Sequence, residues 1–255
     1  MFVETHGHLT GVGREQNLDE VIRWATEAGV VLILTAGIDL SSSIQSVEVA
    51  KRYEPVKACV GIHPWYADEY SEDVHEELKQ LAREKEVVAI SEIGLDFYGR
   101  RDHEGGFSEN YVDEETQLGT FRAQLRLARE IGLPVIVHDR AKGLETLDIL
   151  RGEGVSEVGG AIHGFTGDMD YAKQAIGMGL CLSVADRALS RPENEKLREA
   201  VKEIPLEWLV TETDSGNPEG VVKSAERIAE LKGLPLNVVG RTTTSNLRRL
   251  LKISD

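Results

Sequence analysis

Cysteine is scarce in this chain, with only two among its 255 residues. Cys59 and Cys181 stand alone in apolar stretches, so we expect buried thiols rather than a disulfide or a metal-binding pair. No apolar run approaches the roughly 20 residues of a membrane span, and no signal-peptide pattern opens the sequence. We therefore expect a cytoplasmic protein without a membrane partner.

Positive charge is also in short supply. The chain has 29 Lys and Arg against 44 Asp and Glu, a formal net charge of -15. This balance argues against non-specific binding to long nucleic acids or anionic membranes, but it allows a local cationic pocket for a phosphate. The hydrophobic fraction of 41% and the charged fraction of 29% are those of a soluble globular protein.

What the sequence does contain is a regular alternation of short β-branched runs and longer amphipathic segments. The apolar runs lie at residues 1–3, 30–35, 57–62, 86–94, 133–138, 159–163, 180–185 and 207–213. Helical patterns stand between them, for example over residues 17–29, 76–86 and 114–132, and several end on glycine, as helix C-caps often do. Eight strands, each followed by a helix, over about 250 residues predict an α/β fold, a (β/α)8 TIM barrel.

A doubly wound open sheet is the alternative fold. It would carry a glycine-rich phosphate loop after the first strand, where this sequence has His6, Gly7 and His8. No linker or internal repeat divides the chain, so we expect one domain over residues 1–255. Residues 98–112 form a connection too long for an ordinary βα loop, and we expect a functional loop or an insertion over one end of the barrel.

Polar residues gather where the predicted strands end. Side chains of a strand alternate faces, so Glu4, His6 and His8 are expected to point the same way, and two such imidazoles can grip one metal ion. The chemistry of a barrel of this kind takes place at the C-terminal ends of its strands. The candidates at these ends are His6, His8, His63, Glu92, His138, His163 and Asp214.

Each candidate also has a plain structural interpretation. A single histidine can be a hydrogen-bonded core residue, Glu92 a salt-bridge partner, and Asp214 a helix N-cap. Taken together they converge in a barrel mouth, where buried charges must be paired or must coordinate something. Imidazoles with carboxylates suit a divalent ion. Four histidines and two carboxylates exceed one tetrahedral site and suit two ions, Zn²⁺, Mn²⁺ or Mg²⁺, that share a bridging carboxylate.

The motifs HGH, GIHP, EIGLD, PVIVH, IHGFTG, ETDS and TTTSNLRRLL together resemble those of the TatD-like metal-dependent hydrolases, a branch of the amidohydrolase-type barrels. The resemblance runs from residue 1 to about residue 250. It implies that His6 and His8 hold one metal ion. It also implies that His138 and His163 hold a second ion and that Glu92 bridges the two.

The same resemblance implies catalytic roles. Asp214 would bind a metal ion and handle the attacking water, and His63 would face the substrate. The family pattern differs here around these residues, with Glu4 where Asp is usual, Thr10 where Asp is common, and Trp65 where a polar residue often stands. The implied ligands are intact, whereas the substrate-facing loops have diverged.

Members of this family are similar to deoxyribonucleases and other phosphodiesterases, so our leading hypothesis is metal-dependent hydrolysis of DNA or a small phosphodiester. Arg140, Arg100 and Arg101 would supply positive charge to the phosphate, unless they form ordinary surface salt bridges. Trp65 would stack on a base or cap the barrel rim. Hydrolysis of a small ester, lactone or amide is the second hypothesis, and a non-catalytic metal-binding scaffold is the third. We expect a monomer or a small homo-oligomer.

Overall fold

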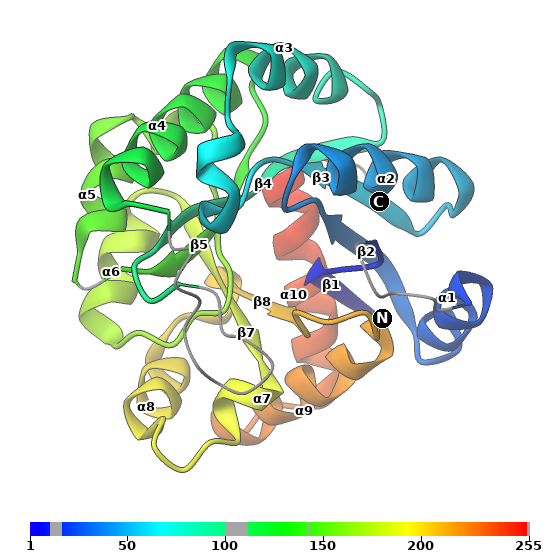
Figure 1. The fold of residues 1–255 in the computed structure, drawn as a ribbon. Helices are drawn as coiled ribbons and strands as arrows, with labels where there is room; N and C mark the ends of the chain where they lie inside the picture. Colours follow the sequence, from blue (N-terminus) through cyan, green and yellow to red (C-terminus); the bar gives the residue numbers. More distant parts are fainter. Residues whose placement is uncertain (11–16, 100–111, 142, 254–255) are drawn as a thin grey trace.

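The computed structural model describes residues 1–10, 17–99, 112–141 and 143–253. Eight parallel strands follow one another in chain order around its centre (Figure 1). The strands are β1 (Phe2–Gly7), β2 (Val30–Ala36), β3 (Val56–Val60), β4 (Val87–Asp96), β5 (Val135–Arg140), β6 (Gly160–Ile162), β7 (Leu180–Ala185) and β8 (Leu209–Glu212). Both ends of each strand lie within four residues of the predicted bounds, and β7 matches them at both ends.

The sheet curves until its last strand lies beside its first. The Asp214 N–H donates to the carbonyl of His6 at 3.0 Å, and Thr211 Oγ1 donates to the carbonyl of Val3 at 2.8 Å. In the opposite direction, the His8 N–H donates to the carbonyl of Ser215 at 2.8 Å. These contacts nearly close the barrel. The prediction of a (β/α)8 barrel is confirmed, and the open sheet is excluded.

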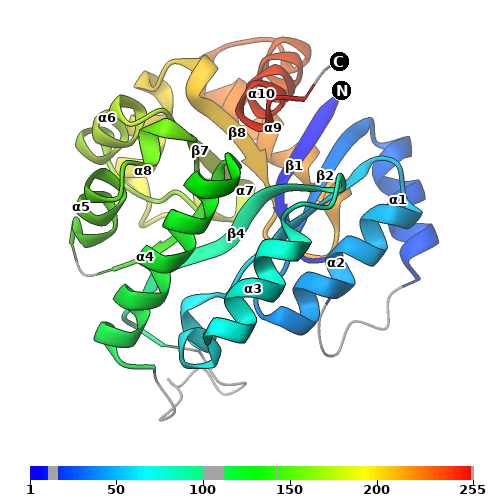
Figure 2. The ribbon, with the colours of Figure 1, turned by 90° about the horizontal axis from the view of Figure 1, so that it is seen from above.

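Helices surround the strands, as Figures 1 and 2 show from two directions. The α-helices are α1 (Leu18–Glu27), α2 (Leu40–Arg52), α3 (Glu72–Leu81), α4 (Glu114–Ile131), α5 (Glu145–Gly152), α6 (Met169–Gly177), α7 (Asp186–Leu189), α8 (Glu195–Glu203), α9 (Val221–Lys232) and α10 (Leu236–Leu251). Short 3-10 helices are η1 (Pro64–Glu69), η2 (Val155–Glu157), η3 (Leu206–Trp208) and η4 (Pro218–Gly220). Within the described part of the chain, no helix has the length and apolar character needed to cross a membrane.

Side-chain caps explain where several helices begin. Asn17, Asp39, Ser71 and Asp113 each accept a hydrogen bond from a backbone N–H in the first turn of the following helix. The cap at Ser71 starts α3 before the predicted segment of residues 76–86, and the helix ends at Leu81 because the chain must then turn into β4. The helix predicted over residues 76–86 therefore lay too far toward the C-terminus of the chain.

Helix α10 covers the barrel at the end where β1 begins (Figure 2). Leu247 and Leu251 of this helix join a group of buried strand side chains that includes Cys59 and Cys181. Both thiols are free and buried, as predicted. Burial raises the pKa of Cys181 to about 11, so this thiol stays protonated and behaves as a small apolar side chain.

A buried carboxylate fastens α5 to α4 on the outside of the barrel. Glu153 accepts hydrogen bonds from Arg126 Nε at 2.9 Å and from Arg122 Nη1 at 2.8 Å. The hydrogen bond from Arg126 is the main reason that the pKa of Glu153 is lowered. A lowered carboxyl pKa stabilises the fold above the unfolded-state pKa of about 4.3, and this stabilisation is lost as the pH falls through the folded-state pKa.

We expect Glu153→Gln to lower the free energy of unfolding by about 1 kcal/mol at pH 7, because both arginine partners are partly exposed and screened by water. The difference from the wild type should shrink as the pH falls through the lowered folded-state pKa of Glu153 and disappear at a more acidic pH, where the wild-type carboxylate is also neutral. Urea unfolding at both pH values measures it. Glu157→Gln, which removes an exposed pair with Arg129, is the control and should cost less than about 0.5 kcal/mol. An equal loss at both pH values for Glu153→Gln would show that charge is not the cause.

Candidate metal centre

The seven residues predicted from the strand ends do meet at the C-terminal end of the barrel. They come from β1 and the residue after it, the loop after β3, β4, β5, the residue after β6 and the loop after β8: His6, His8, His63, Glu92, His138, His163 and Asp214. All but His8 and Asp214 are buried, and these two are partly exposed. Strand β1 ends at Gly7, so His8 belongs to the turn that follows it.

Glu92 stands at the centre of this cluster, and its two oxygens face different histidines. Oε2 lies 3.2 Å from Nε2 of His6 and 3.7 Å from Nε2 of His8. Oε1 lies 2.7 Å from Nδ1 of His138 and 2.8 Å from Nε2 of His163. The two oxygens of this carboxylate therefore face different histidines, although the rings of His6 and His163 also stack on each other with 3.9 Å between their centroids.

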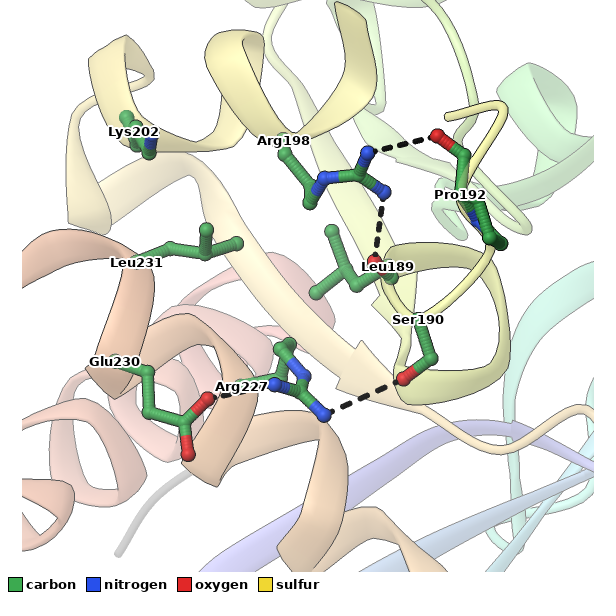
Figure 3. Close-up of a pocket in the computed structure, with 8 residues that line it drawn as sticks. All are labelled: Leu189, Ser190, Pro192, Arg198, Lys202, Arg227, Glu230 and Leu231. Atoms are coloured by element: carbon green, nitrogen blue, oxygen red, sulfur yellow. Dashed lines mark hydrogen bonds and ion pairs between the residues drawn. The ribbon is translucent and has the colours of Figure 1, made fainter. Parts of the chain in front are cut away.

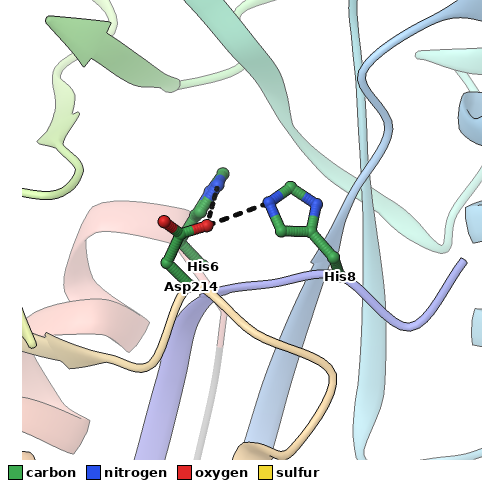
Figure 4. Close-up of side chains that lie close together, drawn as sticks. All are labelled: His6, His8 and Asp214. Atoms are coloured by element: carbon green, nitrogen blue, oxygen red, sulfur yellow. Dashed lines mark hydrogen bonds and ion pairs between the residues drawn. The ribbon is translucent and has the colours of Figure 1, made fainter. Parts of the chain in front are cut away.

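Asp214 completes the side that His6 and His8 occupy (Figure 4). Its Oδ1 lies 3.1 Å from His8 Nε2 and 3.9 Å from His6 Nε2. The backbone of Asp214 has a φ of 52°, in the left-handed region that Asp and Asn enter more readily than other residues with a side chain. The helix η4 has Asn217 as its N-cap, so Asp214 is not the cap of that helix.

His63 lies closer to the cluster than its implied place facing the substrate would require. Its Nε2 is 3.5 Å from Glu92 Oε1, and its ring centroid is 4.5 Å from that of His138. Its Nδ1 accepts the N–H of Trp65 at 3.0 Å, which leaves Nε2 to carry the proton of the neutral ring. Burial lowers the pKa of His63 to about 3, so the ring is neutral at ordinary pH.

The buried carboxylates of the cluster depend on positive charge around them. Burial alone would raise the pKa of Glu92, but the surrounding histidines, His6 and His163 foremost, hold it well below its usual value. Burial opposes charge on His163 as well, yet the carboxylates of Glu92 and Glu212 raise its pKa. Ionised carboxylates in a buried position need positive charge close by, and a divalent ion can supply it.

The donor atoms are close enough to share ions. Three groups have donor atoms that all lie within 4.8 Å of one another: His6, His8 and Asp214; His6, Glu92 and His163; and His63, Glu92 and His138. Imidazole nitrogen and carboxylate oxygen are ligands that Zn²⁺ and Mn²⁺ accept. The residues present therefore fit divalent metal ions.

Sequence reasoning missed Asp96, a buried carboxylate at the end of β4. Its Oδ2 lies 3.1 Å from His138 Nε2 and accepts hydrogen bonds from Trp65 Nε1 and Arg140 Nη1, both at 2.9 Å. A carboxylate behind a metal-binding histidine fixes its ring orientation and tautomer. Asp96 shares the face of Glu92 because the two are four residues apart in a strand, so the alternation of β4 could have revealed it.

Two more buried carboxylates support the cluster from behind. Glu212 Oε1 accepts the N–H of Gly164 at 2.7 Å and lies 3.5 Å from His163 Nδ1. Glu4 Oε1 accepts the N–H groups of His6 and Thr213, each at 3.0 Å. Glu4 thus holds the backbones of β1 and of the segment after β8 together beside the site.

The residues predicted to contact substrate lie on the β4 and β5 side. The Arg140 guanidinium donates to Asp96 and lies 5.8 Å from the ring centroid of Tyr98. The Trp65 ring packs edge-on against His63, with 4.5 Å between the centroids. Arg100 and Arg101 lie outside the described residues. On the opposite side, Arg187 forms an ion pair with Oδ2 of Asp214, and no sequence pattern had indicated it.

A parallel barrel that gathers histidines and carboxylates at the C-terminal ends of its strands has the architecture of a metal-dependent hydrolase. Comparison with known proteins assigns the chain to the same class. The family model for TatD-related DNases matches residues 3–252, and the chain belongs to this family of metal-dependent hydrolases.

Relatives of this family match along the whole chain. The uncharacterized metal-dependent hydrolase YabD of Bacillus subtilis is 32% identical over 266 residues, covering 100% of both chains. The 3'-5' ssDNA/RNA exonuclease TatD of Citrobacter koseri is 28% identical and covers 97% of both chains. The solved structure of YJJV, a TatD homolog from Escherichia coli K12, has a TM-score of 0.86 at 26% identity and covers 99% of this chain and 98% of its own.

Proposed function

We propose that this chain is a phosphodiesterase that cleaves DNA by means of two divalent metal ions. The observation that carries the proposal is the division of Glu92 between two pairs of histidines. Its Oε2 faces His6 and His8, whereas its Oε1 faces His138 and His163. A carboxylate in such a position is suited to bridge two cations.

The proposed ligands follow from these distances. His6 and His8, with Asp214, would hold one ion, and His138 and His163 would hold the other. The abundance of imidazole favours Zn²⁺ or Mn²⁺ over Mg²⁺, which prefers oxygen ligands. When bound, the ions lower the pKa of a water molecule and stabilise negative charge on the phosphoryl group.

The side chains around the ions supply the remaining chemistry. Asp214 accepts the proton of the attacking water, since its carboxylate lies at the partly exposed edge of the cluster. His63, neutral with its proton on Nε2, donates a hydrogen bond to the substrate. Arg140, held by Asp96, contributes positive charge to the phosphate, as Arg100 and Arg101 would do after β4. Trp65 stacks on a base of the substrate.

Nucleic acid is the substrate that the relatives favour, because the TatD relative of Citrobacter koseri carries the name of a single-stranded DNA and RNA exonuclease. A small ester or lactone is the second candidate. It is favoured by the net charge of -15, which repels a polyanion. A scaffold without turnover is the weakest of the three, because both groups of ligands are complete. We propose that residues 1–255 form one domain and that it works in the cytoplasm.

We expect cleavage of a labelled single-stranded oligonucleotide with Mn²⁺ or, more slowly, with Mg²⁺, and an affinity that falls as salt rises, because a few local cations must attract the strand. Gel analysis of the products at several salt concentrations measures both. Turnover of bis(p-nitrophenyl) phosphate beside p-nitrophenyl acetate separates the candidates. If the oligonucleotide and the diester stayed intact while the acetate was hydrolysed rapidly, the protein would be an esterase and not a phosphodiesterase. If no substrate turned over, the scaffold hypothesis would remain.

A further inference from the structure

An arginine at the mouth of the site plays no part in the function proposed above. Arg187 belongs to α7, which follows β7, and its guanidinium pairs with Oδ2 of Asp214. The other oxygen of this carboxylate, Oδ1, faces His8 and His6. A positive charge therefore stands beside the proposed proton acceptor, on the side away from the histidines.

The backbone that carries Arg187 is fastened to the strand end that presents Asp214. The N–H of Asp186 donates to Ser224 Oγ at 3.0 Å, and this hydroxyl donates to the carbonyl of Glu212 on β8 at 2.8 Å. The carboxylate of Asp186 accepts a hydrogen bond from Ser190 Oγ at 2.9 Å. The position of Arg187 relative to β8 is thereby fixed.

Two arginines that line a pocket between α7, α8 and α9 hold the C-terminal end of α7 in place (Figure 3). Arg198 donates to the carbonyl of Leu189 at 3.1 Å and to that of Pro192 at 2.9 Å. Arg227 donates to Ser190 Oγ at 3.5 Å and to Glu230 at 2.7 Å. The two arginines of this pocket are thus used to hold α7, whereas Arg187 of the same helix reaches the metal centre.

The Arg187 side chain is 58% exposed, although it is paired with a carboxylate. A guanidinium has five N–H donors, so a contact with one carboxylate oxygen leaves donors for a second anion. Two non-bridging oxygens of a phosphodiester match the spacing of these donors and share one negative charge. A neutral carboxylic ester has neither feature.

Resting on the proposed function, we infer that Arg187 binds the non-bridging oxygens of the substrate phosphate and thereby selects an anionic diester over a neutral ester. A purely positioning role, in which Arg187 only orients Asp214, makes a different prediction. Asp214 would serve hydrolysis of both kinds of bond at the same metal centre. Loss of a positioning arginine would then slow both substrates in the same proportion.

The test compares Arg187→Gln and Arg187→Lys with the wild type on bis(p-nitrophenyl) phosphate and on p-nitrophenyl acetate. Loss of a charge-assisted contact should lower kcat/KM for the diester by about 10- to 100-fold and change the acetate by less than about twofold. Lysine keeps the charge but loses the paired donors, so it should restore part of the diester activity. Arg151→Gln, an exposed arginine on α5 paired with Asp148, is the control and should change neither substrate.

A direct binding measurement removes the dependence on turnover. Inorganic phosphate titrated calorimetrically into the metal-loaded protein should bind about tenfold more weakly to Arg187→Gln than to the wild type. Unchanged phosphate affinity, or a proportional loss on both ester substrates, overturns the role of Arg187. Failure of the proposed function has another signature, namely a wild-type protein that cleaves neither oligonucleotide nor diester.

Discussion

Asp214→Asn is expected to lower kcat by roughly 10²–10⁴-fold, the loss typical of a missing general base, while most of the bound metal remains. Asparagine keeps the size of the side chain and one acceptor oxygen, but it cannot take the proton of the attacking water. It also tolerates the left-handed backbone that Asp214 adopts, with a φ of 52°, so the fold should be unaffected. Steady-state kinetics with saturating metal and elemental analysis of the same preparation measure both quantities.

Asp148→Asn makes the same chemical change on the exposed surface of α5 and should leave kcat unchanged. If Asp214→Asn kept nearly wild-type turnover at saturating metal, Asp214 would be a spectator ligand. The proton acceptor would then have to be sought among the other groups of the cluster.

The second large effect concerns metal content. We expect Glu92→Gln to lose both ions together with activity, because a neutral amide bridges two cations poorly. His6→Ala and His138→Ala should each remove mainly one ion, since they face different oxygens of Glu92. Loss of one metal-ligating histidine would remove a direct bond to the ion, so we expect the affinity of that ion to fall by at least the 10- to 100-fold typical of losing a group that hydrogen-bonds to a ligand.

Elemental analysis after reconstitution with Zn²⁺ or Mn²⁺ gives the number of ions in each variant. A wild-type content close to two ions and a content close to one in each histidine variant would support the division. His75→Ala, which changes a half-buried histidine paired with Tyr70 on the outer α3 helix, is the control and should keep the wild-type content. Identical stoichiometry in the wild type and both site variants, or no bound metal at all, would contradict a dinuclear centre.

The fold could be predicted because the sequence patterns that mark its strands and its helices are local. Each strand shows a short β-branched run, each helix an amphipathic pattern, and the order of elements in a parallel barrel follows the order of the chain. The residues at which the helices and strands begin and end were harder to predict. Capping at Ser71 and the continuation of β4 to Asp96 depend on single side chains and on pairing with β5, which a pattern of apolar residues does not encode.

The residues of the metal centre could be located because their positions follow from the fold. His138 and His163 come directly from strand ends, and in a barrel all such ends meet. Asp96 was missed because the predicted strand ended before it, and only the continuation of β4 places it on the face of Glu92. Arg187 had no signal of this kind, because its reach to Asp214 depends on how α7 is fastened to β8 through Ser224. Exposed arginines are common in any sequence, and only tertiary structure distinguishes this one.

The contacts between β1 and β8 have a consequence for how the protein acquires its metal. His8 and Asp214 are 206 residues apart in the chain, so this part of the centre can assemble only after the last strand has docked on the first. An ion bound by both residues, as proposed above, would link β1 to the segment after β8, since separating these two strands would also separate its ligands. An ion present at 100 times its dissociation constant would stabilise the closed barrel by about 2.7 kcal/mol. Removal of metal by a chelator should therefore loosen β1 and β8 first, and faster amide hydrogen exchange should begin at these two strands.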